Sequence, residues 1–313
     1  MSRFTARGRV GATIALLAAA LVGTPAIASA APSSTGAENG IERHVPEHAA
    51  SAAAYWTADR MRNAIPADRI TSGKPSKHIT QTPDAAVERG GPQRIEAQKP
   101  AATRVAPISY VGKVFFTLNG ADYVCSGNAV SSANESTVST AGHCVNEGAG
   151  NYASRWIFVP AYDNGRAPYG QWAATEVITT SAWAQRADIS YDVAFAIVAP
   201  LNGRSLSDTV GATGISFNQA RGLTYTAYGY PAAAPFTGQT LQSCAGAARP
   251  DPFGQSLSQG IPCDMTGGSS GGPWLTGGVQ NSVNSFGYSS VRNTMFGPYF
   301  GTAAQQIYQA AAN

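Results

Sequence analysis

The stretch GGSSGGP at residues 267–273 decides how the rest of the chain is interpreted. Two glycines precede the pair of serines and two follow it, and Pro273 comes next. Ser270 is the second serine of the pair. Because glycine has no Cβ, such a turn can expose a hydroxyl and direct neighbouring backbone N–H groups toward one point. This arrangement predicts a nucleophilic serine with an oxyanion hole. Taken alone, the run is more typical of a surface glycine-serine loop.

A histidine lies upstream, in TAGHC at residues 140–144. The chain has four histidines, and the other three precede residue 105, so His143 is the only one in the C-terminal two thirds of the chain. If an imidazole base activates the serine, His143 must supply it. A lone histidine is more often structural, but this one directly follows a strand-like run and stands beside a cysteine.

An imidazole base needs a buried carboxylate that fixes its tautomer and stabilises its protonated form. Asp192 is the best candidate, because it precedes the apolar run at residues 193–198 and would be held at the rim of a β-barrel. Asp188 lies four residues earlier in a more polar setting, and we interpret it as an ordinary surface residue.

The N-terminus has the organisation of a secretory signal peptide. Three arginines precede an apolar run at residues 10–22, and the small residues Ala28-Ser29-Ala30 follow. The apolar run is too short for a membrane span, and no later segment approaches the roughly 18 to 20 residues required. We therefore predict cleavage after residue 30 and a secreted, extracellular protein without a membrane partner.

Residues 31–104 are rich in Ala, Pro, Ser and charge. This composition predicts a largely flexible pro-segment with one helix over about 49–65, or alternatively an extracellular linker. The net charge of +3 belongs to these N-terminal parts, since residues 105–313 carry eight basic and ten acidic side chains. That balance gives no basic patch, and no nucleic-acid partner is expected.

From residue 105 the pattern changes to short β-type runs bounded by Gly, Asn, Asp and Pro. The predicted strands span 110–118, 123–130, 136–140, 156–160, 175–179, 193–198, 215–217, 223–228, 239–244, 273–275 and 283–288. Asn119-Gly120 between the first two is a hairpin signal. No amphipathic helix separates the strands, and only residues 302–312 read as a helix, with Thr302 as N-cap. The pattern predicts an all-β fold of two packed barrels.

Four cysteines in an exported chain favour disulfides over metal ligands. Three connectivities are possible. We favour Cys125 with Cys144 and Cys244 with Cys263, because each pair then closes a loop of similar length within its own half of the domain. Zinc is disfavoured, since there is no C-x-x-C pair and the adjacent positions 143 and 144 strain joint ligation. We assign no metal ligands and the sequence names no cofactor, but calcium binding by scattered Asp and Asn residues stays open.

Together these motifs, in the order His, Asp, Ser, resemble the chymotrypsin-like serine endopeptidases. TAGHC is close to the family's TAAHC, and GSSGGP at 268–273 to its GDSGGP. The resemblance covers residues 105–313. Short loops, the segment YGYP at 228–231 and the Thr-Gly-Gly that leads into the serine turn are similar to bacterial secreted members, particularly the glutamyl-endopeptidase-like branch.

The resemblance implies two six-stranded antiparallel barrels, about 105–203 and 204–313, with a short C-terminal helix. His143 and Asp192 would come from the first barrel and Ser270 from the second, as base, orienting carboxylate and nucleophile. The N–H groups of Gly268 and Ser270 would form the oxyanion hole, and Ser285-Phe286-Gly287 would pair with the substrate backbone. The implied substrates are proteins or peptides, and we expect a monomer.

Three positions depart from the family or bear on specificity. Ser269 replaces the aspartate that pairs with the new N-terminal amine in animal digestive enzymes, so activation by that ion pair is not expected. Asp264, six residues before Ser270, matches the aspartate that selects Arg or Lys at P1, although the glutamyl-endopeptidase-like branch can carry it without that preference. Asn284 stands where glutamate-specific enzymes usually have histidine, which disfavours glutamate specificity.

Ten Lys and Arg residues lie in residues 31–104, whereas Lys113 is the only lysine after them. With the basic-P1 interpretation, this distribution suggests that the enzyme cleaves its own pro-segment near Lys99 or Arg104. Two rival functions stay open. One is a catalytically inactive relative that binds peptides, and the other is an esterase. The residues 268–272 fit G-x-S-x-G, but no helix pattern follows them as an α/β-hydrolase requires.

Overall fold

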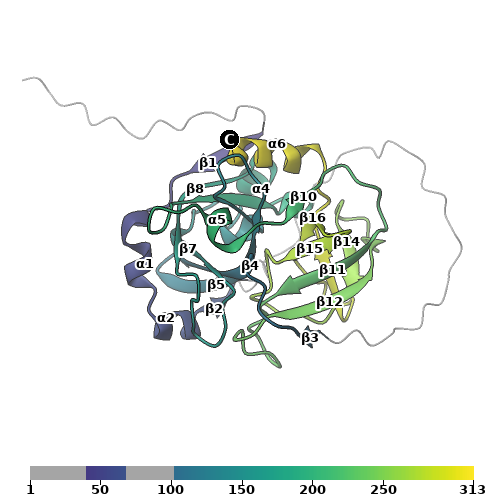
Figure 1. Ribbon diagram of the computed structural model, residues 1–313. Helices are drawn as coiled ribbons and strands as arrows, with labels where there is room; N and C mark the ends of the chain where they lie inside the picture. Colours follow the sequence, from purple (N-terminus) through teal and green to yellow (C-terminus); the bar gives the residue numbers. More distant parts are fainter. Residues whose placement is uncertain (1–39, 68–101) are drawn as a thin grey trace, which may run out of the picture. The chain divides into compact units, whose positions relative to one another are not determined.

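The computed structural model describes residues 40–67 and 102–313 (Figure 1). The predicted signal peptide, most of the predicted pro-segment and Lys99 lie outside the described residues, so those predictions stay predictions.

Six antiparallel strands close the first barrel. They are β4 (Val111–Leu118), β5 (Ala121–Val130), β6 (Thr137–Thr140), β7 (Ser154–Pro160), β8 (Trp172–Thr180) and β9 (Ala194–Val198). Their order is β8-β7-β4-β5-β6-β9, and β9 pairs back with β8. The predicted Asn119-Gly120 hairpin joins β4 to β5, with φ of 50° and 79° at these residues. Positive φ at both positions is the mark of a tight turn that matches strand twist.

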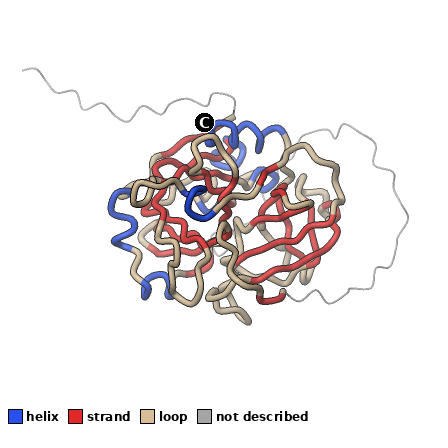
Figure 2. Tube along the Cα trace, viewed as in Figure 1, coloured by secondary structure: helices blue, strands red, loops and turns tan. Residues whose placement is uncertain are grey.

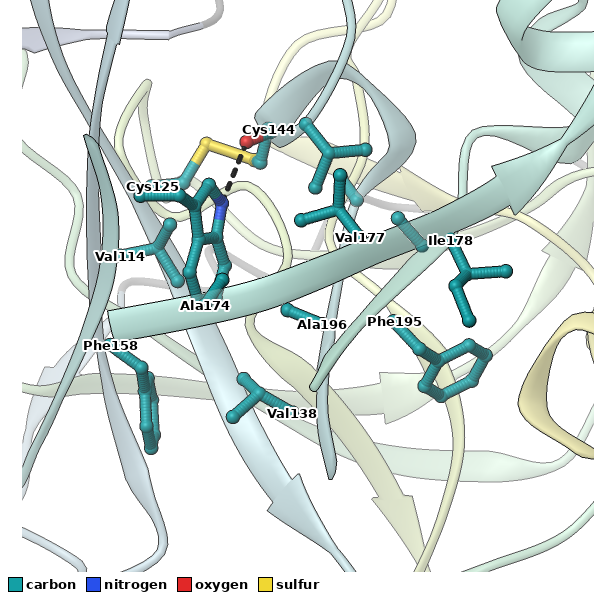
Figure 3. Close-up of a cluster of buried hydrophobic side chains, with 14 of the residues drawn as sticks. Val114, Cys125, Val138, Cys144, Phe158, Ala174, Val177, Ile178, Phe195 and Ala196 are labelled. Atoms are coloured by element: carbon teal, nitrogen blue, oxygen red, sulfur yellow. Dashed lines mark hydrogen bonds between the residues drawn. A yellow bond between two sulfur atoms is a disulfide. The ribbon is translucent and has the colours of Figure 1, made fainter. Parts of the chain in front are cut away.

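Side chains that alternate along these strands fill the barrel. From β4, Val114 and Phe116 point into the same core cluster as Phe158 and Phe195. Figure 3 shows part of this core, with the Cys125–Cys144 disulfide at one side of it. The Trp156 indole N–H donates to the carbonyl oxygen of Cys144 at 3.0 Å. The core therefore holds the residue next to His143 from the inside of the barrel.

The second half of the domain is also built of strands (Figure 2). Its sheet has the order β10-β16-β15-β11-β12-β3, and a smaller sheet has the order β13-β14-β17. These strands are β3 (Thr103–Arg104), β10 (Gly214–Ile215), β11 (Thr224–Gly229), β12 (Gln242–Ala247), β13 (Arg249–Pro250), β14 (Gln259–Pro262), β15 (Pro273–Thr276), β16 (Val279–Val283) and β17 (Thr294–Gly297).

Two links join these sheets into the second barrel. The Cys244–Cys263 disulfide ties β12 to the end of β14, and a bridge between Phe286 and Phe296 continues β16 onto β17. The predicted all-β, two-barrel fold is confirmed. The strand predicted at 283–288 is displaced, because β16 ends at Val283 and the chain beyond it leaves β15 to pair with Phe296.

Helices are few and short. After residue 102 they are α4 (Ser181–Arg186), α5 (Leu206–Val210), α6 (Thr302–Ala312) and the 3-10 turns η2 (Gly142–Cys144) and η3 (Ile189–Tyr191). The predicted C-terminal helix is present, but its N-cap is Gly301, and Thr302 is its first residue with no capping hydrogen bond. No helix in the described residues is long and apolar enough to cross a membrane.

Residues 40–67 are more ordered than their composition predicts. They form β1 (Ile41–His44), η1 (Ala49–Ser51), α1 (Ala52–Tyr55), α2 (Ala58–Asn63) and β2 (Ile65–Pro66). The single helix expected over 49–65 is broken at Trp56, which has ψ of 79°, and restarts after Thr57, whose side chain caps α2 by accepting from the N–H of Arg60. The break turns the Trp56 ring toward the barrel, where it is buried.

Candidate active site

His143 and Asp192 meet through two hydrogen bonds. His143 lies in η2 directly after β6, and Asp192 lies between η3 and β9, which pairs with β6. The backbone N–H of His143 donates to Asp192 Oδ1 at 2.8 Å, and the ring Nδ1 is 2.7 Å from Oδ2. Neither side chain has any exposed surface. The carboxylate thus fixes both the backbone and the ring of the histidine.

A third donor completes the environment of Asp192. The Ser285 hydroxyl donates to Oδ2 at 2.5 Å across from the second barrel. A carboxylate that accepts from Nδ1–H leaves Nε2 of the imidazole as an acceptor. The Nε2 atom of His143 is buried and has no hydrogen-bond partner among the described residues. The arrangement can take a proton at Nε2 while Asp192 stabilises the resulting cation.

Ser270 lies in a turn packed against the segment that carries His143. The carbonyl oxygen of Ser270 accepts from the N–H of Ser126 at 2.7 Å and lies 3.7 Å from the Cys144 sulfur. Gly271, with φ of 82°, has no room for a Cβ, which would clash with Thr140 and with the Ser126 carbonyl. The second barrel therefore places the turn that carries Ser270 against β5 and the end of β6.

The backbone N–H groups of the serine turn divide into two sets. Those of Ser269, Gly271 and Gly272 donate to backbone carbonyls. Those of Gly267, Gly268 and Ser270 donate to no described residue. Gly268 has φ of 93°, and a Cβ there would lie 2.9 Å from the Tyr230 carbonyl, so the turn requires glycine at this position. The N–H groups of Gly268 and Ser270, which are predicted to form the oxyanion hole, are among the groups that donate to no described residue.

Asn284 lies behind the serine turn. Its Nδ2 donates to the carbonyls of Tyr228 and Ser269 at 2.8 and 3.0 Å, and its Oδ1 accepts from the Trp274 indole at 2.7 Å. Its backbone exchanges hydrogen bonds with Gly271 and Gly272. The side chain is fully buried. Asn284 therefore holds the turn that carries Ser270.

Asp264 is half-buried, and in the uncut chain one of its oxygens is occupied. Oδ1 accepts a hydrogen bond of 2.6 Å from the N–H of Ala102. The next residues form β3, which pairs with β12 through Thr103 with Ser243 and Arg104 with Gln242. The segment just before the predicted start of the protease domain thus covers this aspartate.

The predicted substrate strand runs beside β17. The N–H groups of Ser285 and Phe286 donate to the carbonyl of Phe296, and the Phe286 and Phe296 rings stack at 5.2 Å. A Cβ added at Gly287 would meet only the Thr294 carbonyl, at 3.5 Å. This segment continues β16 and leaves the space above Gly287 unfilled by described residues.

Both predicted disulfides are present, Cys125 with Cys144 and Cys244 with Cys263. Nitrogen and sulfur atoms of His143, Cys125 and Cys144 lie within 4.8 Å of one another, a spacing that could suggest a metal site. Because both cysteines are in the disulfide, neither offers the thiolate that a metal requires. Asp188, the second choice for the carboxylate, instead caps η3 by accepting from the N–H of Ser190 at 3.1 Å.

Sequence reasoning missed three supporting residues. Ser126 binds the serine turn, and its place beside Cys125 was the available signal. Trp183 explains why TAGHC has glycine where the family has alanine, since a Cβ on Gly142 would lie 2.7 Å from the Trp183 ring. The third is Asn284, for which the local sequence gives no signal of an inward-facing amide.

Solved structures resemble the chain closely. Protease Anisep from Arthrobacter nicotinovorans is 56% identical over 67% of this chain and 99% of that chain, with a TM-score of 0.66. The thermostable serine protease AL20, from an extremophilic microorganism, is 55% identical over 65% of this chain and 97% of that chain, with a TM-score of 0.63. A Glu endopeptidase at 22% identity covers 67% of this chain and 96% of its own, with a TM-score of 0.55, and shows the shared fold.

A comparison with protein-family models and a search of curated proteins find no match. The structural relatives are sufficient, because two of them exceed half identity over almost their whole length. The predicted resemblance is confirmed, and the chain belongs to the bacterial serine proteases of the chymotrypsin fold.

Proposed function

We propose that this protease is secreted and hydrolyses peptide bonds with Ser270 as nucleophile, His143 as general base and Asp192 as its orienting carboxylate. The observation that carries the proposal is the buried Asp192, which accepts three hydrogen bonds, two of them from His143, while Nε2 of His143 has no partner among the described residues. In the free enzyme the bond from serine to histidine is often long and tightens when substrate binds.

In this mechanism the Ser270 oxygen attacks the peptide carbonyl while Nε2 of His143 takes its proton. The histidine then protonates the leaving amine, and an acyl-enzyme remains. Water, deprotonated by the same histidine, then attacks the acyl-enzyme and releases the product. The N–H groups of Gly268 and Ser270 would stabilise the tetrahedral oxyanion. A single donor of this kind contributes roughly 3 kcal/mol to the transition state.

For specificity we propose a preference for basic P1 residues through Asp264. Its Oδ1 accepts from Ala102 in the uncut chain, so the carboxylate is not freely available there. Cleavage after Arg104 would release β3 from β12 and remove that donor. Residues 105–313 would be about two thirds of the chain, a share similar to that matched by the solved proteases. This supports a zymogen in which processing frees the specificity aspartate.

Secretion through the signal peptide at residues 1–30 is part of the proposal. Two disulfides support an oxidising destination, since such bonds persist outside the cytosol. The protease is proposed to act as a monomer on protein or peptide substrates.

The triad is tested by labelling the processed protein with an organophosphonate and digesting a peptide library, with Ser270→Ala as control. We expect labelling at Ser270 and cleavage that both disappear in the variant. Folded protein without Ser270-dependent labelling would favour the peptide-binding alternative. Labelling with turnover of small esters but not of peptides would favour the esterase.

The specificity proposal is tested with benzamidine, a mimic of the arginine side chain. We expect the processed protein to bind it, the uncut Arg104→Gln chain to bind it at least about tenfold more weakly, and Asp264→Asn to abolish binding. A processed protein that cleaves peptides without binding benzamidine would refute the assignment of Asp264 and leave the triad intact.

A further inference from the structure

Residues 40–67, here called the N-terminal clamp, cover an apolar outer face of the first barrel. Alternate side chains of β4 and β7 point away from the barrel interior and join residues of the clamp in one buried cluster. The barrel contributes Val111, Phe115, Val124, Ile157 and Val159, and the clamp contributes Ala52, Trp56, Met61 and Ala64. The barrel wall is therefore apolar on both faces, and the outer face is shielded in part by the clamp.

Trp56 is the centre of this contact. It is 1% exposed, its ring centroid lies 5.4 Å from that of Phe115, and its indole N–H donates to the Arg155 carbonyl at 2.6 Å. The Trp56 carbonyl in turn accepts from the side chain of Gln171 at 3.0 Å. A large buried aromatic with its polar atom satisfied is the typical anchor of a specific interface.

The clamp also pairs with strand edges that the barrel leaves open. β7 pairs only with the start of β8. The later part of β8 pairs with β1, from Ile41 with Thr180 to His44 with Val177. β6 pairs only with the end of β5. The earlier part of β5, at Tyr123 and Val124, pairs with β2, which runs parallel to it. In Figure 1 the clamp elements lie beside β8, β7 and β5. Main-chain pairing at two separated edges fixes the register of the segment.

Charged groups add specificity at both ends of the clamp. Arg43 pairs with Glu176 at 2.9 Å, and Arg60 pairs with Asp122 at 3.2 Å. Glu42 accepts from the side chains of Ser181 and Gln185 on α4, at 3.0 and 2.7 Å. Partners of the clamp are thus spread over β5, β7, β8 and α4 of the first barrel.

The clamp does not touch the candidate active site. Within the described residues, none of its hydrogen bonds, ion pairs or ring contacts involves His143, Asp192 or Ser270. The part of this chain that matches Anisep covers 99% of that chain, and it is a smaller share of this chain than residues 40–67 and 102–313 make up together.

We propose that the N-terminal clamp is a separable partner of the first barrel, which recognises its outer face by non-covalent contacts alone and leaves Ser270 accessible. It would stay bound after the connection through residues 68–101 is cut. The binding part of this proposal does not rest on the catalytic proposal, because it can be measured in a chain that lacks the nucleophile.

The experiment places a recognition sequence for an unrelated, highly specific protease between residues 68 and 101 of the full chain, in a Ser270→Ala background. After cutting, size-exclusion chromatography at micromolar concentration and mass spectrometry identify which fragments elute together. We expect the clamp fragment to coelute with the protease domain and to separate in denaturant. Separation of the wild-type fragments under native conditions would overturn the proposal.

Trp56→Ala should weaken the association by about 100-fold or more, the equilibrium equivalent of losing a buried tryptophan. The matched control is Val45→Ala, because Val45 is in the same segment but 67% exposed. Equal retention of the Trp56→Ala fragment would contradict the assigned interface. If that variant does not fold, labelled wild-type fragment can be displaced by an unlabelled peptide of residues 40–67, which must outcompete its Trp56→Ala version.

Accessibility is measured with Ser270 intact. The cut complex should react with an organophosphonate within about twofold of the rate of the Trp56→Ala form that has lost its clamp. A tenfold faster reaction without the clamp would show that the clamp blocks the site. Absence of labelling in both forms would refute the catalytic proposal and leave the clamp interface standing.

Discussion

Lys113 offers a quantitative test of the structure, because it is a buried lysine without a carboxylate partner among the described residues. Its ammonium donates to the Gly238 carbonyl at 2.8 Å and lies 4.5 Å from the ring centroid of Tyr162. Burial lowers the pKa of Lys113 from 10.5 to about 7. Between these two values the unfolded chain holds a proton that the folded protein has released.

The sign follows from proton binding. Where the unfolded state binds more protons, the free energy of unfolding rises with pH. The full pKa difference corresponds to a cost in folding free energy of about 5 kcal/mol. This cost applies in full below pH 7 and is absent above pH 10.5. Between pH 7 and pH 9 about 2 kcal/mol of this cost is relieved.

The perturbation is Lys113→Met, which keeps most of the length of the side chain and removes the charge. It is made in a Ser270→Ala background, so that self-digestion does not obscure unfolding by urea at pH 7 and pH 9. The parent should gain about 2 kcal/mol over this interval and Lys113→Met less than about 0.5 kcal/mol. Arg249→Met, which removes an exposed cation, should keep the gain of the parent. Equal gains in parent and Lys113→Met would refute the buried, uncompensated ammonium.

Three further substitutions test the site and its support. Gly142→Ala should cost about 1 to 3 kcal/mol of stability and lower kcat/KM, because the added Cβ would lie 2.9 Å from Asp192 Oδ1. In the control Gly150→Ala only a flexible glutamate side chain is in the way, so neither stability nor kcat/KM should change. Urea melts and enzyme assays measure the two quantities. Asn284→Ala leaves a buried indole N–H unpaired and removes one donor from each of two carbonyls, so we expect a loss of about 3 kcal/mol and slower phosphonate labelling. Labelling at the parent rate would contradict its role behind the serine turn. Replacing Cys244 and Cys263 by alanine should cost about 3 kcal/mol for a separation of 19 residues, and urea melts showing under about 1 kcal/mol would contradict this.

Much of the fold and the site follows from local sequence. The hairpin at Asn119-Gly120 was predictable because the turn type demands residues that tolerate positive φ. The pairing of four cysteines and the contact between His143 and Asp192 followed from motifs that each fix a short stretch of backbone. The strands β14 and β17 escaped prediction, since Gly260, Pro262 and the polar ends of these short runs mask the alternation that marks a strand.

What the sequence by itself determined is the set of proposed reacting groups and their order, because a nucleophile, a base and a glycine turn are chemical properties of single residues and their immediate neighbours. Only the tertiary structure decided which groups support them. Ser285 reaches Asp192 across 93 positions, Ser126 holds Ser270 across 144, and Trp56 finds Phe115 from outside the barrel. Such partners are selected by burial and by the need to satisfy every polar atom in the interior, and neither condition can be evaluated until the chain has closed.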